Sequence, residues 1–157
     1  MNKKILIIGL KGLIGSNLFN YFKTKKINVY QLSFESFLKN KNINKFDVII
    51  NCTSNQKFIE NQYQDRNDND LIIAKKIIHS KTKLVMLSTR KVYKAKFNIN
   101  ELDKEKPNCN YSKNKVISEI SVREILANRV LILRISNIIS LPNTNKRKLH
   151  KTFSDIF

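Results

Sequence analysis

A tyrosine and a lysine four residues apart, Tyr111 and Lys115, form the pair in this sequence best suited to proton transfer. On a helix, this spacing places the phenol and the ammonium on one face. An ammonium next to the phenol stabilises the phenolate, which lowers the pKa of the tyrosine and lets it exchange a proton with a substrate oxygen. The pair therefore predicts an acid/base site, in which the lysine can also bind a ribose.

The same spacing occurs at Tyr21 and Lys25, because lysine is abundant in this chain. We interpret that pair as structural, since Tyr21 falls on the back of the first expected helix. Tyr111 is favoured by two hydroxyls, Ser88 and Thr89, which close an apolar run. The carboxyl edge of an open α/β sheet is where such folds bind ligands, so a hydroxyl at this position would orient a carbonyl next to the tyrosine.

All three glycines of the chain lie within seven positions, after an apolar run and before an amphipathic segment. A strand, a GxxGxxG turn and a helix form the arrangement in which a pyrophosphate reaches the amide end of the helix. The alternative is a tight strand-to-helix turn that binds nothing. We expect a cofactor-binding turn made of Gly9, Lys11, Gly12, Leu13, Ile14 and Gly15.

The end of the second strand bears on the choice of cofactor. An acidic residue there normally binds the adenosine ribose of NAD, but the corresponding position is near Ser33, and the nearest carboxylate is Glu35. Lys11 lies in the glycine turn, where a cation would meet a 2′-phosphate. We therefore expect NAD or NADP, with a weak preference for NADP.

Short apolar runs alternate with segments long enough for crossover helices, which is typical of an α/β fold with a parallel sheet. Between the second and third runs there is room for one short helix. Right-handed crossovers then predict a Rossmann-type doubly wound sheet with strand order 2-1-3-4-5. The five expected strands are 5–8, 29–32, 48–50, 84–87 and 130–135.

Three longer helices are expected between these strands, each with an apolar stripe toward the sheet. The first begins at the glycine turn, the second is capped or charged at its start by Asp68 and Asp70, and the third runs from about Tyr111 to Ala127. We expect the second helix to bury Leu71, Ile72, Ala74, Ile77 and Ile78, and the third to bury Val116, Ile117, Ile120 and Ile125.

The composition excludes several classes of protein. Two separated cysteines, Cys52 and Cys109, and two isolated histidines, His79 and His150, predict neither a disulfide framework nor a metal site. The apolar run near the N-terminus is too short for a signal peptide or a membrane span, so we expect a cytoplasmic protein. The formal net charge of +18 leaves nucleic-acid binding as an alternative function. We favour it less, because the lysines are scattered along the chain. Lysine, asparagine and isoleucine are also the residues that dominate in proteins encoded by AT-rich genes.

Together these segments resemble the extended short-chain dehydrogenase/reductase family, the NAD-dependent epimerase/dehydratase group that acts on nucleotide sugars. The resemblance implies that Thr89, Tyr111 and Lys115 are the catalytic residues and that Cys52 and Thr53 line the cofactor cleft. The short connection between the second and third strands resembles the dTDP-4-dehydrorhamnose reductase branch, which implies carbonyl reduction. The segments that carry the likeness are "ILIIGLKGLIG", "DVIINCT", "LSTRKVY", "NELDKEKPNCNYSKNK" and "LILRISNI".

One departure from the family narrows the chemistry. Its dehydratases carry an Asp-Glu pair after the catalytic threonine, whereas this chain has Arg90 and Lys91. Cations cannot replace carboxylates in an acid/base elimination, so dehydration is disfavoured.

Length is the other departure, because members of this family continue well beyond this chain. We therefore expect an NAD(P)-binding domain over residues 1–140 and a polar tail over 141–157 that leads toward a further substrate-binding region. A homodimer is compatible with the family. The alternative function is an NAD(P)-binding module without turnover, either a remnant or a redox sensor.

Overall fold

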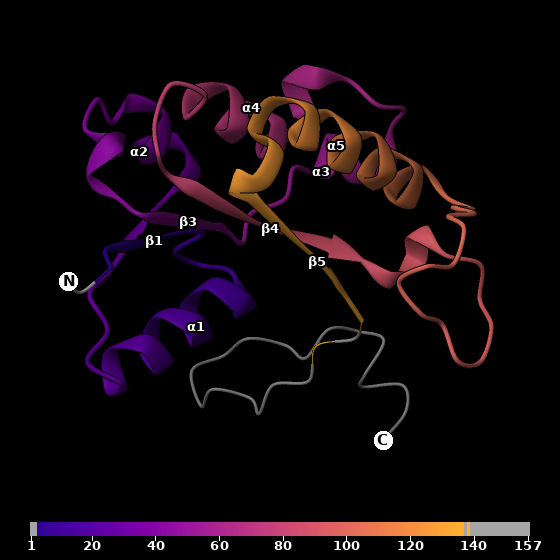
Figure 1. Ribbon diagram of the computed structural model, residues 1–157, viewed down its shortest axis with the longest axis horizontal. Helices are drawn as coiled ribbons and strands as arrows, with labels where there is room; N and C mark the ends of the chain where they lie inside the picture. The colour runs from indigo at the N-terminus through magenta and orange to yellow at the C-terminus, as the bar shows by residue number, and fades with distance from the viewer. Residues whose placement is uncertain (1–2, 137, 139–157) are drawn as a thin grey trace.

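The strands of the computed structural model, which describes residues 3–136 and 138, form one parallel sheet in the order β2-β1-β3-β4-β5 (Figure 1). This confirms the predicted fold class and strand order. Each strand end lies within two residues of the expected position. The strands are β1 (Ile5–Ile8), β2 (Val29–Leu32), β3 (Val48–Asn51), β4 (Lys83–Thr89) and β5 (Val130–Ile135).

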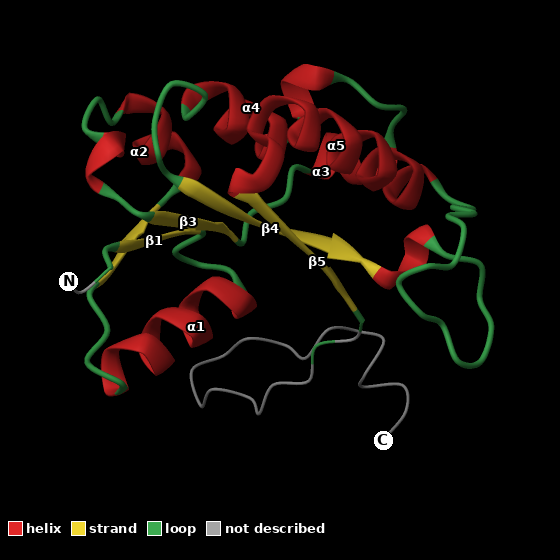
Figure 2. Ribbon diagram, viewed as in Figure 1, coloured by secondary structure: helices red, strands yellow, loops and turns green. Residues whose placement is uncertain are grey.

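The helices that connect the strands cover the two faces of the sheet unequally (Figure 2). In the described chain, α1 lies on one face, and α2, α4 and α5 lie on the other. The side chains of β1 alternate between the two layers, because successive residues of a strand point to opposite faces: Leu6 and Ile8 pack with α2, α4 and α5, and Ile7 packs with α1. The helices are α1 (Leu13–Thr24), α2 (Phe34–Lys39), α3 (Gln56–Glu60), α4 (Asn69–Lys76) and α5 (Asn110–Leu126).

The buried face of α5 differs from the prediction. Ile117 and Ile120, which we expected inside, are 40% and 54% exposed. The face that packs on the sheet instead buries mostly polar side chains at its N-terminal end, followed by Val122 and Leu126. A side chain that must reach the carboxyl edge of the sheet belongs on this inner face, so polar residues displace the apolar stripe. The buried polar positions are Ser112, Asn114, Lys115, Ser118 and Glu119.

The prediction for α4 was partly wrong in the same way. Its buried apolar residues include Ile73, while Ile78 lies beyond the end of the helix and is 42% exposed. Asp68 caps α4 as expected, because its Oδ1 accepts hydrogen bonds from the backbone N–H groups of Asp70 (3.0 Å) and Leu71 (3.1 Å).

The predicted polar tail over 141–157 lies outside the described residues. Within the described residues no helix has the length and apolar character needed to cross a bilayer. The same part of the chain holds no cluster of three or more metal-ligating side chains.

Candidate active site

The glycine turn joins β1 to α1, and two of its glycines are required by the fold itself. Gly9 has φ +123°, a conformation that residues with a side chain rarely adopt. A Cβ on Gly15 would lie 2.2 Å from the backbone oxygen of Gly9, so only glycine lets α1 start this close to the end of β1. The Gly9 N–H donates to the Leu32 carbonyl at 2.9 Å, which fixes the turn to β2.

Gly12 is different, because the fold leaves room for a side chain there. Its φ is −75°, and among the residues that the structure describes a Cβ would have only the Cys52 carbonyl within 4 Å, at 3.6 Å. Gly12 is exposed at the N-terminal end of α1, together with Lys11 and Leu13, whereas Ile14 is half-buried. A glycine that neither packing nor backbone geometry demands leaves the backbone uncovered at the amide end of α1, where an anionic ligand can approach it.

Cys52 follows β3 and lies against the glycine turn, and Thr53 comes directly after it. A Cβ on Gly9 would meet the carbonyl of Cys52 at 3.1 Å, and the Cys52 N–H donates to the Ile8 carbonyl at 2.9 Å. Burial, with a smaller contribution from the negative charge of Asp70, raises the pKa of the Cys52 thiol to about 11. This thiol is therefore neutral at physiological pH and acts as a small apolar wall.

Ser33 follows β2, as expected, and caps α2. Its hydroxyl accepts a hydrogen bond from the Ser36 N–H at 3.1 Å, and it lies 2.8 Å from the Ser36 hydroxyl. Glu35 lies in the first turn of α2. The end of β2 is thus followed directly by the Ser33 hydroxyl, and the Glu35 carboxylate comes two residues later.

Thr89 ends β4, where it is buried and its Oγ1 accepts a hydrogen bond from the Lys91 N–H at 3.2 Å. The preceding Ser88 donates instead to Glu119 of α5. The short 3₁₀ turn Arg90–Val92, which follows Thr89, packs against α5. This contact brings the start of α5, and with it Tyr111, to the same edge of the sheet as Thr89.

Tyr111 is half-buried in the first turn of α5, and Lys115 lies one turn later on the buried face. The Lys115 Nζ donates to Asp70 Oδ2 at 2.8 Å and lies 5.4 Å from the centre of the Phe58 ring. Burial alone would lower the pKa of Lys115, but the Asp70 carboxylate outweighs it, with Tyr111 adding a smaller contribution, and the pKa lies above its usual value. Lys115 is therefore a fixed, positively charged group.

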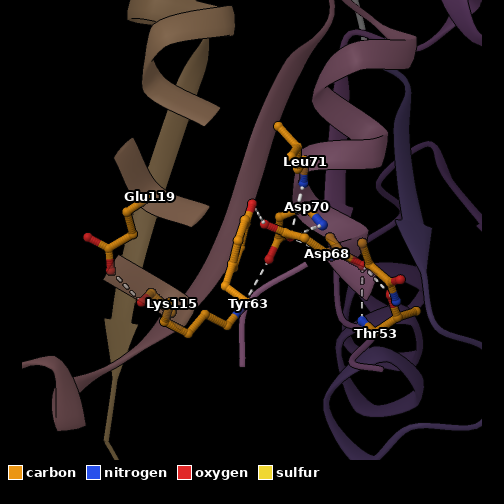
Figure 3. Close-up of polar contacts among 10 residues, drawn as sticks. Thr53, Tyr63, Asp68, Asp70, Leu71, Lys115 and Glu119 are labelled. Carbon is orange, nitrogen blue, oxygen red and sulfur yellow. Dashed lines mark hydrogen bonds and ion pairs between the residues drawn. The ribbon is translucent and has the colours of Figure 1, made fainter. Parts of the chain in front are cut away.

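Figure 3 shows how Lys115 extends from α5 toward the start of α4, into a cluster that the sequence analysis did not predict as part of a site. Asp70 Oδ1 accepts a hydrogen bond from Asn51 Nδ2 at 2.7 Å, and the Tyr63 hydroxyl donates to Asp68 Oδ2 at 3.0 Å. The sequence marked both aspartates only as helix-start residues. One signal in the sequence could have indicated the site. A helix start needs one capping side chain, so the second of the two aspartates, Asp70, is free for another role.

A second network joins α5 to β5. Arg134 binds Glu119, Glu105 and the Tyr93 hydroxyl, with its Nη2 2.6 Å from both carboxylates. It also lies over the Tyr93 ring, 4.8 Å from the ring centre. The Glu119 hydrogen bonds are the main reason that the pKa of Arg134 is raised, so its charge is held at any physiological pH. This network fixes the segment after Thr89 against β5.

An open hollow of about 1050 Å³ lies between the 93–102 segment and β5, away from the glycine turn. Basic side chains from Arg90, Lys96 and Arg123 line it, together with Leu131 and Leu133 of β5. These two leucines are 56% and 41% exposed, because α1 does not reach this part of the sheet.

A parallel sheet in this order, with a glycine turn after its first strand, defines the Rossmann-type class of fold. Residues 3–155 match the family described as the RmlD substrate binding domain, and the chain therefore belongs to that family. This confirms the resemblance to extended short-chain dehydrogenases/reductases. A comparison with curated protein sequences found no match.

Solved structures agree with this assignment. A dTDP-4-dehydrorhamnose reductase from Yersinia enterocolitica is 25% identical with a TM-score of 0.74, over 93% of this chain and 56% of that chain. One from Clostridium acetobutylicum is 25% identical with a TM-score of 0.67, over 83% and 52%. One from Bacillus anthracis in complex with NADP is 19% identical with a TM-score of 0.67, over 87% and 54%. This chain spans about half the length of these relatives.

Proposed function

We propose that this chain is the NAD(P)-binding part of an oxidoreductase or epimerase that acts on a nucleotide sugar, with carbonyl reduction as the leading reaction. The observation that carries the proposal is Gly12. The fold tolerates a side chain at this position, yet the residue is a glycine at the N-terminal end of α1. A pyrophosphate that contacts the backbone there accounts for it.

The residues around the turn fit a dinucleotide. Gly9, Gly12 and Gly15 supply bare backbone, and Lys11, Leu13 and Ile14 complete the turn. Cys52 borders the turn at the end of β3, and Thr53 is the next residue of the chain. The similar reductases support this assignment by their names, and one of them was crystallised with NADP.

The preference for NADP rests on Ser33 and Lys11. The hydroxyl at the end of β2 does not repel a 2′-phosphate, and Lys11 is an exposed cation in the turn. The carboxylate of Glu35 lies one residue inside α2, past the position from which a ribose is normally bound. We propose NADP as the preferred form.

Catalysis would use three side chains of this chain, while the nicotinamide supplies or accepts a hydride. Tyr111 would exchange a proton with the substrate oxygen. Thr89, at the end of β4, would orient the carbonyl by a hydrogen bond from its hydroxyl. Lys115 would keep a positive charge next to the phenol and bind the nicotinamide ribose.

The test is a fluorescence titration of the purified chain with NADH and NADPH. We expect saturable binding of both, with NADPH tighter, and we expect Tyr111→Phe to bind as well as the wild type. Absence of saturable binding to either nucleotide would remove the basis of the proposal. Hydride transfer with a nucleotide-sugar ketone then tests the reaction itself, and there Tyr111→Phe should abolish turnover.

A second function, cofactor binding without turnover, is favoured by one observation. The Lys115 ammonium is already bound by Asp70, and burial limits its freedom to follow a substrate. A binding module predicts NAD(P)H affinity that is equal in the wild type and Tyr111→Phe, with no hydride transfer to any nucleotide-sugar ketone. Measurable turnover would exclude it.

A further inference from the structure

Asp70 is a buried carboxylate that α4 does not need for its own start. Asp68 caps the helix, while Asp70 is 3% exposed and gives both of its oxygens to other elements. Its Oδ1 accepts from Asn51 at the end of β3, and its Oδ2 accepts from Lys115 of α5. Asp70 therefore bridges two elements that carry proposed site residues.

Stability does not explain this arrangement. Burying two charges costs desolvation energy that their attraction only roughly repays, so an apolar pair of similar size would serve the fold as well. The chain also contains an exposed pair, Asp65 and Lys75, at 2.9 Å with side chains 65% and 56% exposed. That pair has the same chemistry without the desolvation cost, and it makes a matched control.

The bridge continues from Asp70 to the segment that borders the glycine turn. Asn51 donates to Asp70 with its amide nitrogen and accepts with its amide oxygen from the Thr53 N–H at 3.0 Å and the Thr53 hydroxyl at 2.7 Å. Asn69 adds a hydrogen bond to the same hydroxyl at 2.9 Å. The position of the Lys115 ammonium is thus coupled to the loop after β3.

We propose that Asp70 is the positioning residue of Lys115: its carboxylate binds the buried ammonium and holds it, next to Tyr111, toward the proposed cofactor site after β3. The role of Asp70 in cofactor binding rests on the proposed function, whereas the contact between Asp70 and Lys115 is observed independently of it. Asp70 touches no reacting atom and acts through Lys115.

The surroundings of Lys115 fix what happens when Asp70 is removed. Burial then lowers the pKa of the ammonium, with only weaker opposition from the remaining groups. The Phe58 ring contributes no titratable group, and the nearest carboxylate on α5 is already bound by Arg134. The titratable groups on the elements around the ammonium are Tyr111 and Glu119 of α5, Asp68 and Asp70 at the start of α4, and Cys52 after β3.

The direct experiment measures NADPH affinity from pH 7 to about pH 9.5 for the wild type, Asp70→Asn and the control Asp65→Asn. We expect flat profiles for the wild type and the control, because Lys115 stays charged. For Asp70→Asn we expect about tenfold weaker binding at the high end than at pH 7, since a charged hydrogen bond is lost as the lysine deprotonates. Asp70→Glu should restore the flat profile.

A second measurement follows Lys115 in the wild type, so it depends neither on the folding of Asp70→Asn nor on the cofactor. Nitrogen-15 NMR of the side-chain ammonium groups, assigned with Lys115→Arg, follows the titration of Lys115. We expect its ammonium to persist above about pH 10.4, the usual pKa of lysine. Titration below that value, or a flat affinity profile in Asp70→Asn, would overturn the proposal. Failure of the wild type to bind either nucleotide would overturn the proposed function, while the NMR titration would still decide the role of Asp70.

Discussion

The glycine turn and the Lys115–Asp70 pair lie on two sides of the same strand end, and they are built in opposite ways. On one side the Cys52 carbonyl packs against backbone that carries no side chains. On the other side the neighbouring Asn51 binds a buried carboxylate and, through it, a buried ammonium. The first region offers bare amides to a ligand, and the second offers fixed charge. The two regions that the proposed function needs at one sheet edge are thus built by different physical means.

The largest expected effect comes from breaking the charged region. Lys115→Met leaves Asp70 as a buried carboxylate whose one remaining side-chain partner among the described residues is Asn51. Removing one member of a buried pair costs about 4 kcal/mol of unfolding free energy, measured by urea denaturation. The double variant Lys115→Met with Asp70→Leu should recover much of this loss. Equal losses in the single and double variants would contradict a coupled pair.

The next largest effect is expected from a substitution in the glycine turn. Gly15→Ala places a methyl group 2.2 Å from the Gly9 oxygen, and backbone must move to relieve the contact. We expect a loss of about 3 kcal/mol, as for severe overpacking, measured in the same denaturation series. An unchanged denaturation midpoint would mean that α1 does not start this close to β1.

A smaller effect, which depends on pH, is expected when the buried Asp68 carboxyl is replaced. Burial, with the neighbouring Asp70 charge adding to it, raises the pKa of the Asp68 carboxyl above its unfolded value. The stabilisation from the Asp68 carboxyl is therefore fully present at pH values below its pKa in the unfolded chain. It is lost as the pH rises through its higher pKa in the folded protein. Asp68→Asn keeps a capping oxygen, so at about pH 4 it should match the wild type within about 0.5 kcal/mol.

As pH rises to 7, the Asp68→Asn variant should gain stability relative to the wild type, because the asparagine carries no desolvation cost for a charge. Thermal melts at several pH values measure this difference. A difference that stays constant, or that moves in favour of the wild type, would show that the folded protein stabilises the charged carboxylate instead.

The smallest effect is expected at the exposed pair. Lys75→Ala removes an ion pair whose side chains are more than half exposed, and such pairs contribute about 0.5 kcal/mol or less. The same denaturation series measures it. A loss comparable to that of Lys115→Met would show that burial is not what distinguishes the two pairs.

The sequence predicted the parts of the site that depend on local pattern. The glycine turn and the position of Tyr111 and Lys115 on one helix follow from local spacings, and the sheet order follows from the alternation of short apolar runs with crossover segments along the chain. The partner of Lys115 lies 45 residues away on another helix, and no spacing links charges that meet only after folding. Arg134 and Glu119 were missed for the same reason, since they come from β5 and α5.

The error on α5 has a related cause. An apolar stripe predicts the inner face of a helix when the helix only packs, but α5 must also carry Lys115 and Glu119 to buried partners. Ile117 and Ile120 therefore turn outward, where they leave an apolar surface. The apolar periodicity therefore predicted the wrong buried face of α5, because it takes no account of buried polar residues.

The most direct test of the central claim is NADPH binding by Gly12→Ala. The fold has room for the methyl group, with its nearest neighbour at 3.6 Å, so thermal stability should change by no more than about 1 kcal/mol. We expect NADPH binding nevertheless to be lost or at least about tenfold weaker, because the methyl group occupies the place of the pyrophosphate. A variant that folds like the wild type and binds NADPH with the same affinity would contradict the account.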